Sequence, residues 1–115
     1  MSGAPLTLDA QRVGETFVVA AHGELDLATC RGLQAALEDG REGIAALVLD
    51  LRGVEYMDTS GLRLVFAERE RAAEGRYRFA VVRGPRRIQR LFEIAGLPPA
   101  DGLFVDDPAE LSGDR

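Results

Sequence analysis

The chain of 115 residues is long enough for one domain and leaves little for a second. Hydrophobic residues form 46% of it, which is enough for an ordinary core without a metal or disulfide to reinforce it. The net charge of −5 provides no global positive field, so we do not expect nucleic acid as a partner. All 14 basic residues are arginine, which excludes functions that need a lysine amine, such as a P-loop, a Schiff base or a phospho-aspartate receiver domain.

The single cysteine, Cys30, and the single histidine, His22, cannot form a disulfide framework or a zinc site of the usual four-ligand kind. This cysteine content is typical of a reducing compartment. No apolar stretch reaches the length of a membrane span, and residues 1–5 lack the charged and then apolar layout of a secretion signal. We therefore expect a cytoplasmic protein with no membrane insertion, no metal and no cofactor.

The first predicted elements are two strands. Residues 6–12 alternate apolar and polar side chains, as a strand with one buried face does. Val13-Gly14 favours a tight turn, and residues 16–22, rich in valine and alanine, form the second strand. Two strands joined by so short a turn pair as an antiparallel hairpin.

A helix and a central strand come next. The helix begins after residues 23–26 (GELD), carries apolar residues at helical spacing and ends at Gly40. Cys30 lies on that apolar stripe, so we interpret it as a small core residue and not as a reactive thiol. Residues 45–51 form a near-continuous apolar run, which is typical of a central strand covered on both faces.

The second helix follows residues 58–61 and ends at Gly75, and the next strand covers residues 77–82. A third helix starts near Pro85, a residue suited to a first turn. The expected buried positions of these two helices are Leu62, Val65, Phe66, Ala72, Ala73, Ile88, Leu91, Phe92 and Ala95.

The chain closes with a short strand over residues 103–105 and a brief helix capped by Asp107. Strands that alternate with helices predict an α/β fold. The leading hairpin makes the sheet mixed, with about five strands packed against about four helices.

The segment between the central strand and the second helix, residues 56–62 (YMDTSGL), carries the most unusual chemistry. Asp58, Thr59 and Ser60 are all preferred N-caps, because their side-chain oxygens accept the amide hydrogens left free where a helix starts. One such residue satisfies that need, whereas three in succession followed by Gly61 exceed it. Ser60 is therefore either part of the cap or a functional serine, and residue chemistry alone leaves both open.

A functional serine has a definite physical role here. A hydroxyl at a helix N-terminus is displayed at the carboxyl edge of the sheet, where α/β proteins usually place their sites. The helix dipole and free amide hydrogens at that end can hold a phosphate without moving the fold. Phosphorylation of Ser60 adds close to two negative charges beside Asp58. A resulting loss of about 3 kcal/mol in partner binding corresponds to more than a hundredfold in affinity, which is enough for a switch.

At this point the sequence resembles the STAS domains, specifically the anti-sigma factor antagonists. Residues 58–62 (DTSGL) resemble the phosphorylation signature of that family. Residues 23–26, the apolar strand 47–51 and residues 91–97 match the family in order and spacing. The likeness covers roughly residues 6–111, so we expect residues 1–115 to form a single STAS domain with a STAS-like sheet.

The resemblance implies a binding switch and not an enzyme. The unphosphorylated protein binds an anti-sigma factor that is also a serine kinase with the histidine-kinase-like ATPase fold, and this releases the sigma factor. Phosphorylation of Ser60 separates the pair, and a metal-dependent phosphatase of the PP2C type resets it. The residues that the resemblance assigns to the partner surface are Asp26, Asp58, Thr59, Gly61 and Leu62.

Three residue patterns resemble those of enzymes, but each lacks a feature that the enzyme needs. Residues 58–59 (DT) resemble an aspartic protease motif, but that motif needs glycine next and an all-β chain. Asp50 resembles a receiver phosphoacceptor, but the required lysine is absent, so we expect Asp50 to cap or hydrogen-bond in the adjacent loop. Ser60, Asp26 and His22 supply the residue types of a hydrolase triad. A Gly-x-Ser-x-Gly elbow is missing, however, and His22 falls within a strand, so we interpret it as structural.

Four arginines gather around the start and outer face of the third helix. We interpret them as a solvated face. The alternative is a patch that meets acidic groups of a partner or steers its approach. These arginines are Arg83, Arg86, Arg87 and Arg90.

A second function stays open beside the switch: a STAS docking subunit of a membrane transport complex for a lipid or an anion. In that function the same surface binds its partner permanently, and Ser60 only caps the helix. An intact phosphoacceptor in a stand-alone domain favours signalling.

Overall fold

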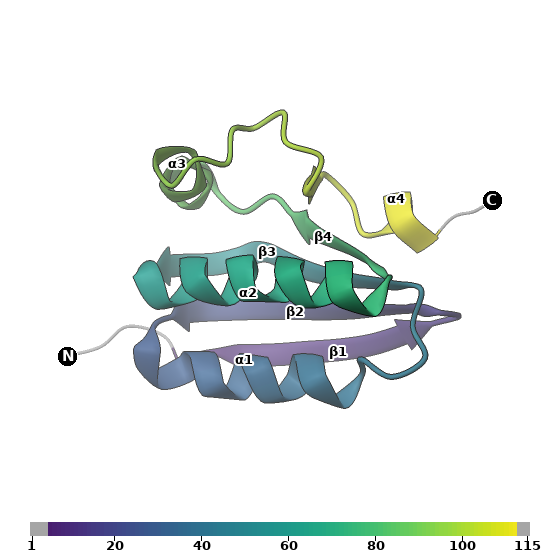
Figure 1. The fold of residues 1–115 in the computed structure, drawn as a ribbon. Coiled ribbons are helices and arrows are strands. Elements are labelled where there is room, and N and C mark those ends of the chain that lie inside the picture. The colour runs from purple at the N-terminus through teal and green to yellow at the C-terminus, as the bar shows by residue number, and fades with distance from the viewer. Residues whose placement is uncertain (1–4, 113–115) are drawn as a thin grey trace.

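The computed structural model describes residues 5–112 and shows helices packed against a five-stranded sheet (Figure 1). The elements in chain order are β1 (Thr7–Val13), β2 (Thr16–Leu25), α1 (Leu27–Asp39), β3 (Ala46–Met57), α2 (Thr59–Gly75), β4 (Arg78–Val82), α3 (Arg86–Ile94), β5 (Phe104–Val105) and α4 (Ala109–Ser112). The strands lie in the order β1-β2-β3-β4-β5, with β1 antiparallel to β2 and the other neighbours parallel. This mixed sheet confirms the predicted fold class. Within residues 5–112, no helix combines the length and the apolar character that crossing a membrane requires.

β1 and β2 form the predicted antiparallel hairpin. Its turn residues are Gly14 and Glu15, one position later than predicted, because Val13 still pairs with Thr16 in the ladder. Gly14 has a φ of +63°, in the left-handed region where a side chain is disfavoured. The glycine thus allows the tight turn that fixes the register of the two strands.

β3 is longer than the predicted strand of residues 45–51, since it continues to Met57. Its first part, through Asp50, pairs with both β2 and β4, and its last part pairs with β2 alone. Two register shifts interrupt that last part, and the strand still ends with Met57 opposite Leu25. The ladder therefore brings the ends of β2 and β3 to the same level, and α1 and α2 start beside one another (Figure 1).

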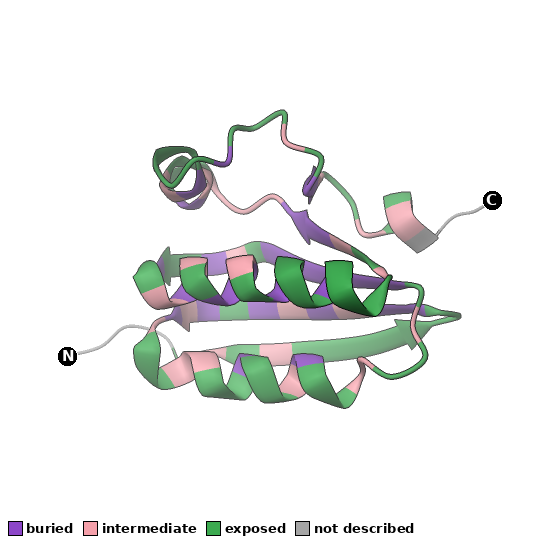
Figure 2. Ribbon diagram, in the orientation of Figure 1, coloured by how far each residue is buried: buried purple, intermediate pink, exposed green. Residues whose placement is uncertain are grey.

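The core lies between the sheet and the helices α1 and α2, and the buried residues follow the sheet in Figure 2. Alternate residues of β2 point into it, namely Phe17, Val19 and Ala21. Farther along the same core cluster, toward β5, α3 contributes Phe92, whose ring packs edge-on against Phe104 at a centroid distance of 5.3 Å. This packing gives β5, which has only two residues, a place at the edge of the sheet.

Two positions predicted to be buried in the helices are exposed. Ala73 faces outward because the inner positions of α2 at four-residue spacing belong to Leu64, Glu68 and Ala72. Ala95 lies after the last residue of α3 as its C-cap, so it is not part of the buried stripe. Among the other predicted positions, Val65, Ala72, Ile88 and Phe92 are buried and Leu62, Phe66 and Leu91 are half-buried.

α2 ends at Gly75, as predicted, but the left-handed residue that follows the helix is not a glycine. Arg76 takes that conformation, with a φ of +62°. Gly75 serves a different purpose, because a Cβ there would lie 2.8 Å from the ring of Tyr77. The end of α2 therefore places a side chain where helices commonly use glycine.

Candidate functional site

The first turns of α1 and α2 are held by two aspartates at the ends of neighbouring strands. Asp26 caps α1 by accepting a hydrogen bond of 3.0 Å from the amide of Thr29, whose hydroxyl in turn accepts from the amide of Asp26. Asp58 caps α2 and accepts from the amide of Ser60 at 2.8 Å. The amide of Asp58 also donates to the carbonyl of Leu25 at 3.2 Å, which ties the second cap to the end of β2.

Three amides in the first turn of α2 already have acceptors. The amide of Ser60 donates to the Asp58 carboxylate, and the amides of Gly61 and Leu62 donate to the Asp58 carbonyl at 3.1 and 3.4 Å. The expectation that free amides at this end hold a phosphate is therefore wrong for these three groups. A phosphate on Ser60 needs other donors, or it must displace Asp58 from the cap.

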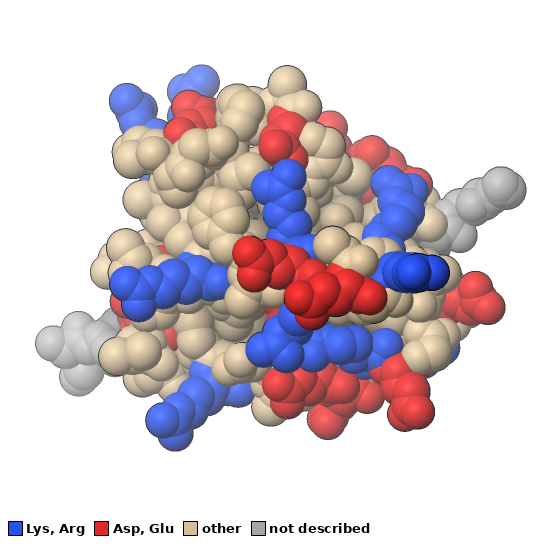
Figure 3. Space-filling view, in the orientation of Figure 1, with Lys and Arg blue, Asp and Glu red and all other residues tan. Residues whose placement is uncertain are grey.

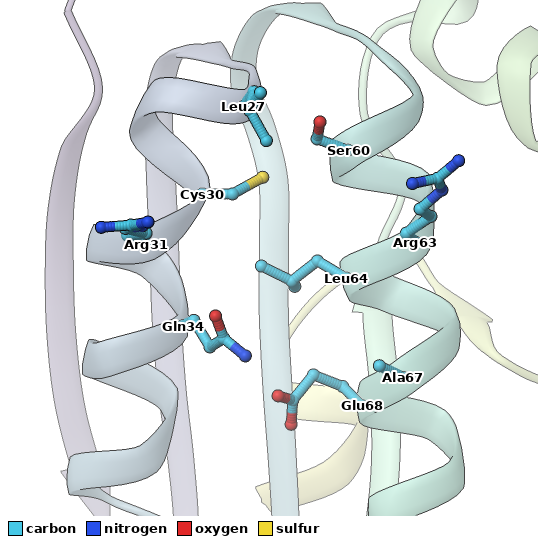
Figure 4. Close-up of a pocket in the computed structure, with 9 residues that line it drawn as sticks. All are labelled: Leu27, Cys30, Arg31, Gln34, Ser60, Arg63, Leu64, Ala67 and Glu68. Carbon is cyan, nitrogen blue, oxygen red and sulfur yellow. The ribbon is translucent and has the colours of Figure 1, made fainter.

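Ser60 lies at the mouth of a groove between α1 and α2 (Figure 4). Its side chain is half-buried, and its hydroxyl makes no hydrogen bond with any other residue in the range 5–112. In the close-up, the hydroxyl oxygen lies beside the first turn of α2, toward the end of the groove where Leu27 stands. The serine amide therefore takes part in the cap, whereas its hydroxyl does not.

The groove has a volume of about 360 Å³ and runs along both helices. Leu27, at its open end, is 76% exposed although it is a large apolar residue. Apolar surface of Leu27 and the Ser60 hydroxyl are therefore both accessible in the same groove. The residues that line the groove are Leu27, Cys30, Arg31, Gln34, Ser60, Arg63, Leu64, Ala67 and Glu68.

Cys30 forms part of the wall of this groove and is half-buried, so its interpretation as a core residue is only partly right. Burial raises the pKa of its thiol, and the negative charges of Asp58 and Asp26 raise that pKa further. The thiol is therefore protonated near neutral pH, in agreement with the prediction that it is not a reactive nucleophile.

A buried ion pair at the other end of the groove was not predicted from the sequence. Glu68 on α2 is 1% exposed and accepts two hydrogen bonds from Arg41, at 2.7 and 2.8 Å. Arg41 comes from the segment after α1, so the pair joins the two helices. A signal was present, since Glu68 is spaced four residues from Leu64 and four from Ala72 on the apolar stripe of α2.

The five residues assigned to the partner surface differ in their exposure. Thr59 is exposed, and Asp26, Asp58 and Leu62 are half-buried around the start of the helices. Gly61 is buried, and a Cβ at this position would overlap the side chain of Met57. The glycine therefore lets α2 pack closely on the end of β3, which sets the position of its neighbour in the chain, Ser60.

Comparisons with known proteins point to one family. The sequence matches the family model described as "Mlab, STAS domain" over residues 7–102. The anti-sigma-F factor antagonist RsfB of Mycobacterium tuberculosis is 31% identical over 99 residues, which are 85% of this chain and 80% of the relative. The anti-sigma-B factor antagonist of Staphylococcus aureus is 30% identical over 107 residues, 92% of this chain and 97% of the relative. This chain belongs to the STAS domain family.

Solved structures support the assignment of this chain to the STAS domain family. An anti-sigma factor antagonist from Mycobacterium paratuberculosis has a TM-score of 0.77 at 29% identity and covers 96% of this chain and 97% of its own. Bacillus SpoIIAA has the same fold in its unphosphorylated form, with a TM-score of 0.76 at 19% identity and 92% coverage of both chains. The resemblance inferred from the residues to STAS domains and anti-sigma factor antagonists is confirmed.

Asp50 and His22, which belong to enzyme-like patterns in the sequence, have structural contacts in the STAS protein. Asp50 is inside β3, where its carboxylate binds the Arg52 side chain at 2.8 Å and accepts from the Arg52 amide at 3.0 Å. The prediction of a hydrogen-bonding role was right, but the place is a strand and not a loop. His22 is exposed on β2, as the strand prediction implied, and a Cβ on Gly53 would overlap its ring. Its imidazole makes no hydrogen bond with Ser60 or with any other residue described, whereas its backbone pairs in the sheet.

The predicted arginine cluster of the STAS protein splits into two pairs. Arg83 binds Asp106 at 2.8 Å, and Arg87 donates to the carbonyl of Glu55 at 2.8 and 3.1 Å. These two fix the segments around α3. Arg86 and Arg90 are exposed along α3, as the interpretation of a solvated face predicts for them.

Proposed function

We propose that this STAS protein is an anti-sigma factor antagonist that is switched off by phosphorylation of Ser60. In its unphosphorylated form it binds an anti-sigma factor with serine kinase activity and the histidine-kinase-like ATPase fold, and the sigma factor is freed. The kinase transfers the γ-phosphoryl group of ATP to the Ser60 oxygen, which loses its proton, and ADP leaves. A PP2C-type phosphatase removes the phosphate. The protein acts in the cytoplasm by binding, without catalysis of its own.

One observation carries the proposal: the Ser60 hydroxyl stands at the mouth of the α1–α2 groove without an intramolecular hydrogen bond among the residues described. A kinase can reach it there without unfolding the helix. The cap of α2 does not depend on this hydroxyl, because the Asp58 carboxylate provides the acceptor. Modification of Ser60 therefore leaves the local fold intact.

The surroundings of Ser60 explain how a phosphate releases the partner. Asp58 and Asp26 lie close enough together that both influence Cys30, which lines the same groove. A phosphate adds close to two further negative charges to this corner, next to the exposed Leu27. A partner that buries Leu27 must then desolvate or repel that charge, with a loss of roughly 3 kcal/mol or more than a hundredfold in affinity.

Relatives of the chain support the antagonist assignment. The two curated relatives described above are antagonists of anti-sigma-F and anti-sigma-B factors, and they match over most of their own length. SpoIIAA has also been solved in a phosphorylated form, with a TM-score of 0.71 to this chain at 20% identity. That protein keeps the shared fold when it carries a phosphate, as the proposed switch requires.

The test is phosphorylation by candidate serine kinases, followed by intact-mass measurement and binding. We expect a gain of one phosphate that Ser60→Ala abolishes and Thr59→Ala, the matched hydroxyl next to it, retains. Ser60→Asp is expected to weaken the kinase complex at least tenfold, while Ser60→Ala keeps it. If Ser60→Asp binds as tightly as wild type, release by charge is wrong, and the permanent docking subunit becomes the better function.

A further inference from the structure

A phosphate on Ser60 lacks an obvious source of positive charge in the cap of α2. The amides of Ser60, Gly61 and Leu62 already donate to Asp58. The neighbouring side chains on the caps, Asp58 and Asp26, are negatively charged. Arginine guanidinium groups are the usual partners of a phosphorylated side chain, because their planar fork matches the phosphate oxygens. The arginines of the groove are the cations available to anchor it.

Two arginines line the groove with Ser60, Arg63 from α2 and Arg31 from α1. Arg63 is three residues after Ser60 and so lies on the same face of the helix. Helical side chains lean toward the N-terminus, and in Figure 4 the Arg63 guanidinium extends toward the first turn of α2, on the side of that helix away from α1, while the Arg31 guanidinium lies on the side of α1 away from Ser60. At a spacing of three residues, rotation about the side-chain bonds of Arg63 can bring its guanidinium to a phosphoryl group on Ser60.

Neither arginine has another charge to neutralise within the described part of the chain. Of residues 5–112, none forms a salt bridge with Arg31 or Arg63, and neither guanidinium donates a hydrogen bond there. Other arginines of the protein differ in this respect. The arginines in ion pairs are Arg41, Arg52, Arg69, Arg71 and Arg83.

We propose that Arg63, assisted by Arg31 from across the groove, anchors the phosphoryl group of phosphorylated Ser60 at the groove mouth. This inference rests on the proposed function and adds a regulatory residue to it. The anchored phosphate covers the groove entrance beside Leu27, so phosphorylation blocks the partner by occupying the surface as well as by adding charge. The phosphorylated state is then a single defined conformation and not a freely rotating group.

The second ionisation of the phosphate measures this contact directly. A nearby cation stabilises the dianion and lowers its pKa, whereas nearby carboxylates raise it. The charged and titratable groups around the groove are Asp26 and Asp58 at the helix caps, Cys30 and Arg31 on α1, and Arg63 and, at the other end, Glu68 on α2. Loss of Arg63 leaves the acidic groups in place, so the pKa of the phosphate must rise.

The experiment uses full-length protein with phosphoserine incorporated at position 60 during translation, so that no kinase is needed. Phosphorus NMR titration then gives the pKa of the phosphate. We expect Arg63→Gln to raise it by about half a unit, Arg31→Gln to raise it by less, and Arg63→Lys to restore part of the difference. Arg90→Gln, which removes an equal charge from the exposed face of α3, is expected to leave it unchanged.

Each outcome decides the matter. An unchanged titration in Arg63→Gln overturns the anchor, and an equal rise in Arg90→Gln assigns the effect to overall charge and overturns it as well. A rise only in Arg31→Gln removes Arg63 from the role. Since the phosphate is placed without a kinase, these results hold whether or not a kinase recognises Ser60, and failure of the proposed function is detected separately by the phosphorylation assay.

Discussion

The two ends of the α1–α2 groove are built in opposite ways. At one end the buried Glu68 and Arg41 join the helices through hydrogen bonds of 2.7 and 2.8 Å. At the other end, Leu27 is 76% exposed and the Ser60 hydroxyl has no hydrogen-bond partner among residues 5–112. Figure 3 shows the same contrast on the surface, since acidic and basic side chains intermingle over the later turns of the helices and basic side chains stand apart over the first turns.

This contrast separates stability from function along one pair of helices. The closed end holds α1 and α2 in place, so its residues are constrained by packing and by the need to pair buried charge. The open end has apolar surface and a hydroxyl that contribute little to the fold, and it is free to serve binding and modification. Changes at the closed end should therefore reduce stability, and changes at the open end should alter recognition alone.

The largest expected effect is on stability, at the closed end. Glu68→Ala leaves Arg41 half-buried without its partner and opens space beside Leu64. Breaking a buried pair on one side costs about 3–5 kcal/mol, and because Arg41 keeps 22% of its side-chain surface in solvent we expect roughly 2–3 kcal/mol. Chemical denaturation measures the difference in the free energy of unfolding.

A matched control for this variant is Glu70→Ala, an exposed carboxylate on the same helix, which should change stability by less than about 0.5 kcal/mol. The folded fraction of Glu68→Ala should still accept a phosphate on Ser60. Equal stability of the two variants would contradict the idea that the closed end holds the helices together.

The open end was accessible from the sequence because its signals are local. Asp58, Thr59 and Ser60 are consecutive, and cap chemistry alone placed them at the start of a helix. At the closed end, the spacing of Glu68 on the apolar stripe of α2 signals its burial, but its partner could not be predicted, because Arg41 is 27 residues away in the sequence. Only tertiary packing brings the two together.

The last part of β3 was not predicted from the sequence, for a different reason. The apolar run stops at Leu51, and the exposed Arg52 and Glu55 conceal the continuation of the strand to Met57. Hydrogen bonding to β2, with two register shifts, maintains the strand there. This extension aligns the caps of α1 and α2. The residues around Ser60 could be predicted from the sequence, but their position beside Asp26 depends on the pairing of β3 with β2.

The second prediction concerns recognition at the open end. Leu27→Ala removes exposed apolar surface that contributes little to the core, so stability should change by less than about 0.5 kcal/mol. Binding of the kinase partner should weaken by about 1–2 kcal/mol, or roughly tenfold, if the partner buries this leucine. Calorimetric titration with the purified partner measures it.

A control for Leu27→Ala is Ile94→Ala at the end of α3, since Ile94 is similarly exposed at 77%. We expect this variant to bind normally. A loss of binding in Ile94→Ala with none in Leu27→Ala would move the partner surface away from the groove.

The third prediction is a substitution that raises the stability of the fold and leaves the residues of the open end unchanged. Arg76 holds a φ of +62° after the last turn of α2, which disfavours a residue with a side chain by about 1 kcal/mol. Arg76→Gly should therefore increase the free energy of unfolding by about 0.5–1 kcal/mol. Thermal unfolding measures the gain, and partner affinity should stay at the wild-type value. A lower melting temperature would mean that the Arg76 side chain contributes more than its backbone strain removes.

The smallest expected effect is on the reactivity of the Cys30 thiol, which responds to the negative charge at the open end. Burial raises the pKa of its thiol, and Asp58 and Asp26 raise it further. Because the thiolate is the reactive form, iodoacetamide should modify folded protein at pH 8 more slowly than free cysteine. The same shift bears on folding: the unfolded thiol loses its proton first as pH rises, so this contribution to stability is complete below about pH 8.5 and is lost at higher pH.

The source of the slow reaction is testable at Asp58. Asp58→Asn keeps an oxygen to cap α2 but removes one negative charge, so the thiol pKa should fall and modification should speed up by about twofold. Asp9→Asn, an exposed carboxylate on β1, should have no effect. Phosphoserine at position 60 should act in the opposite direction and slow the reaction, because its charge enters the same groove. A reaction as fast as that of free cysteine in both phosphorylation states would mean that neither burial nor charge acts on Cys30, and that the open end is more hydrated than its geometry indicates.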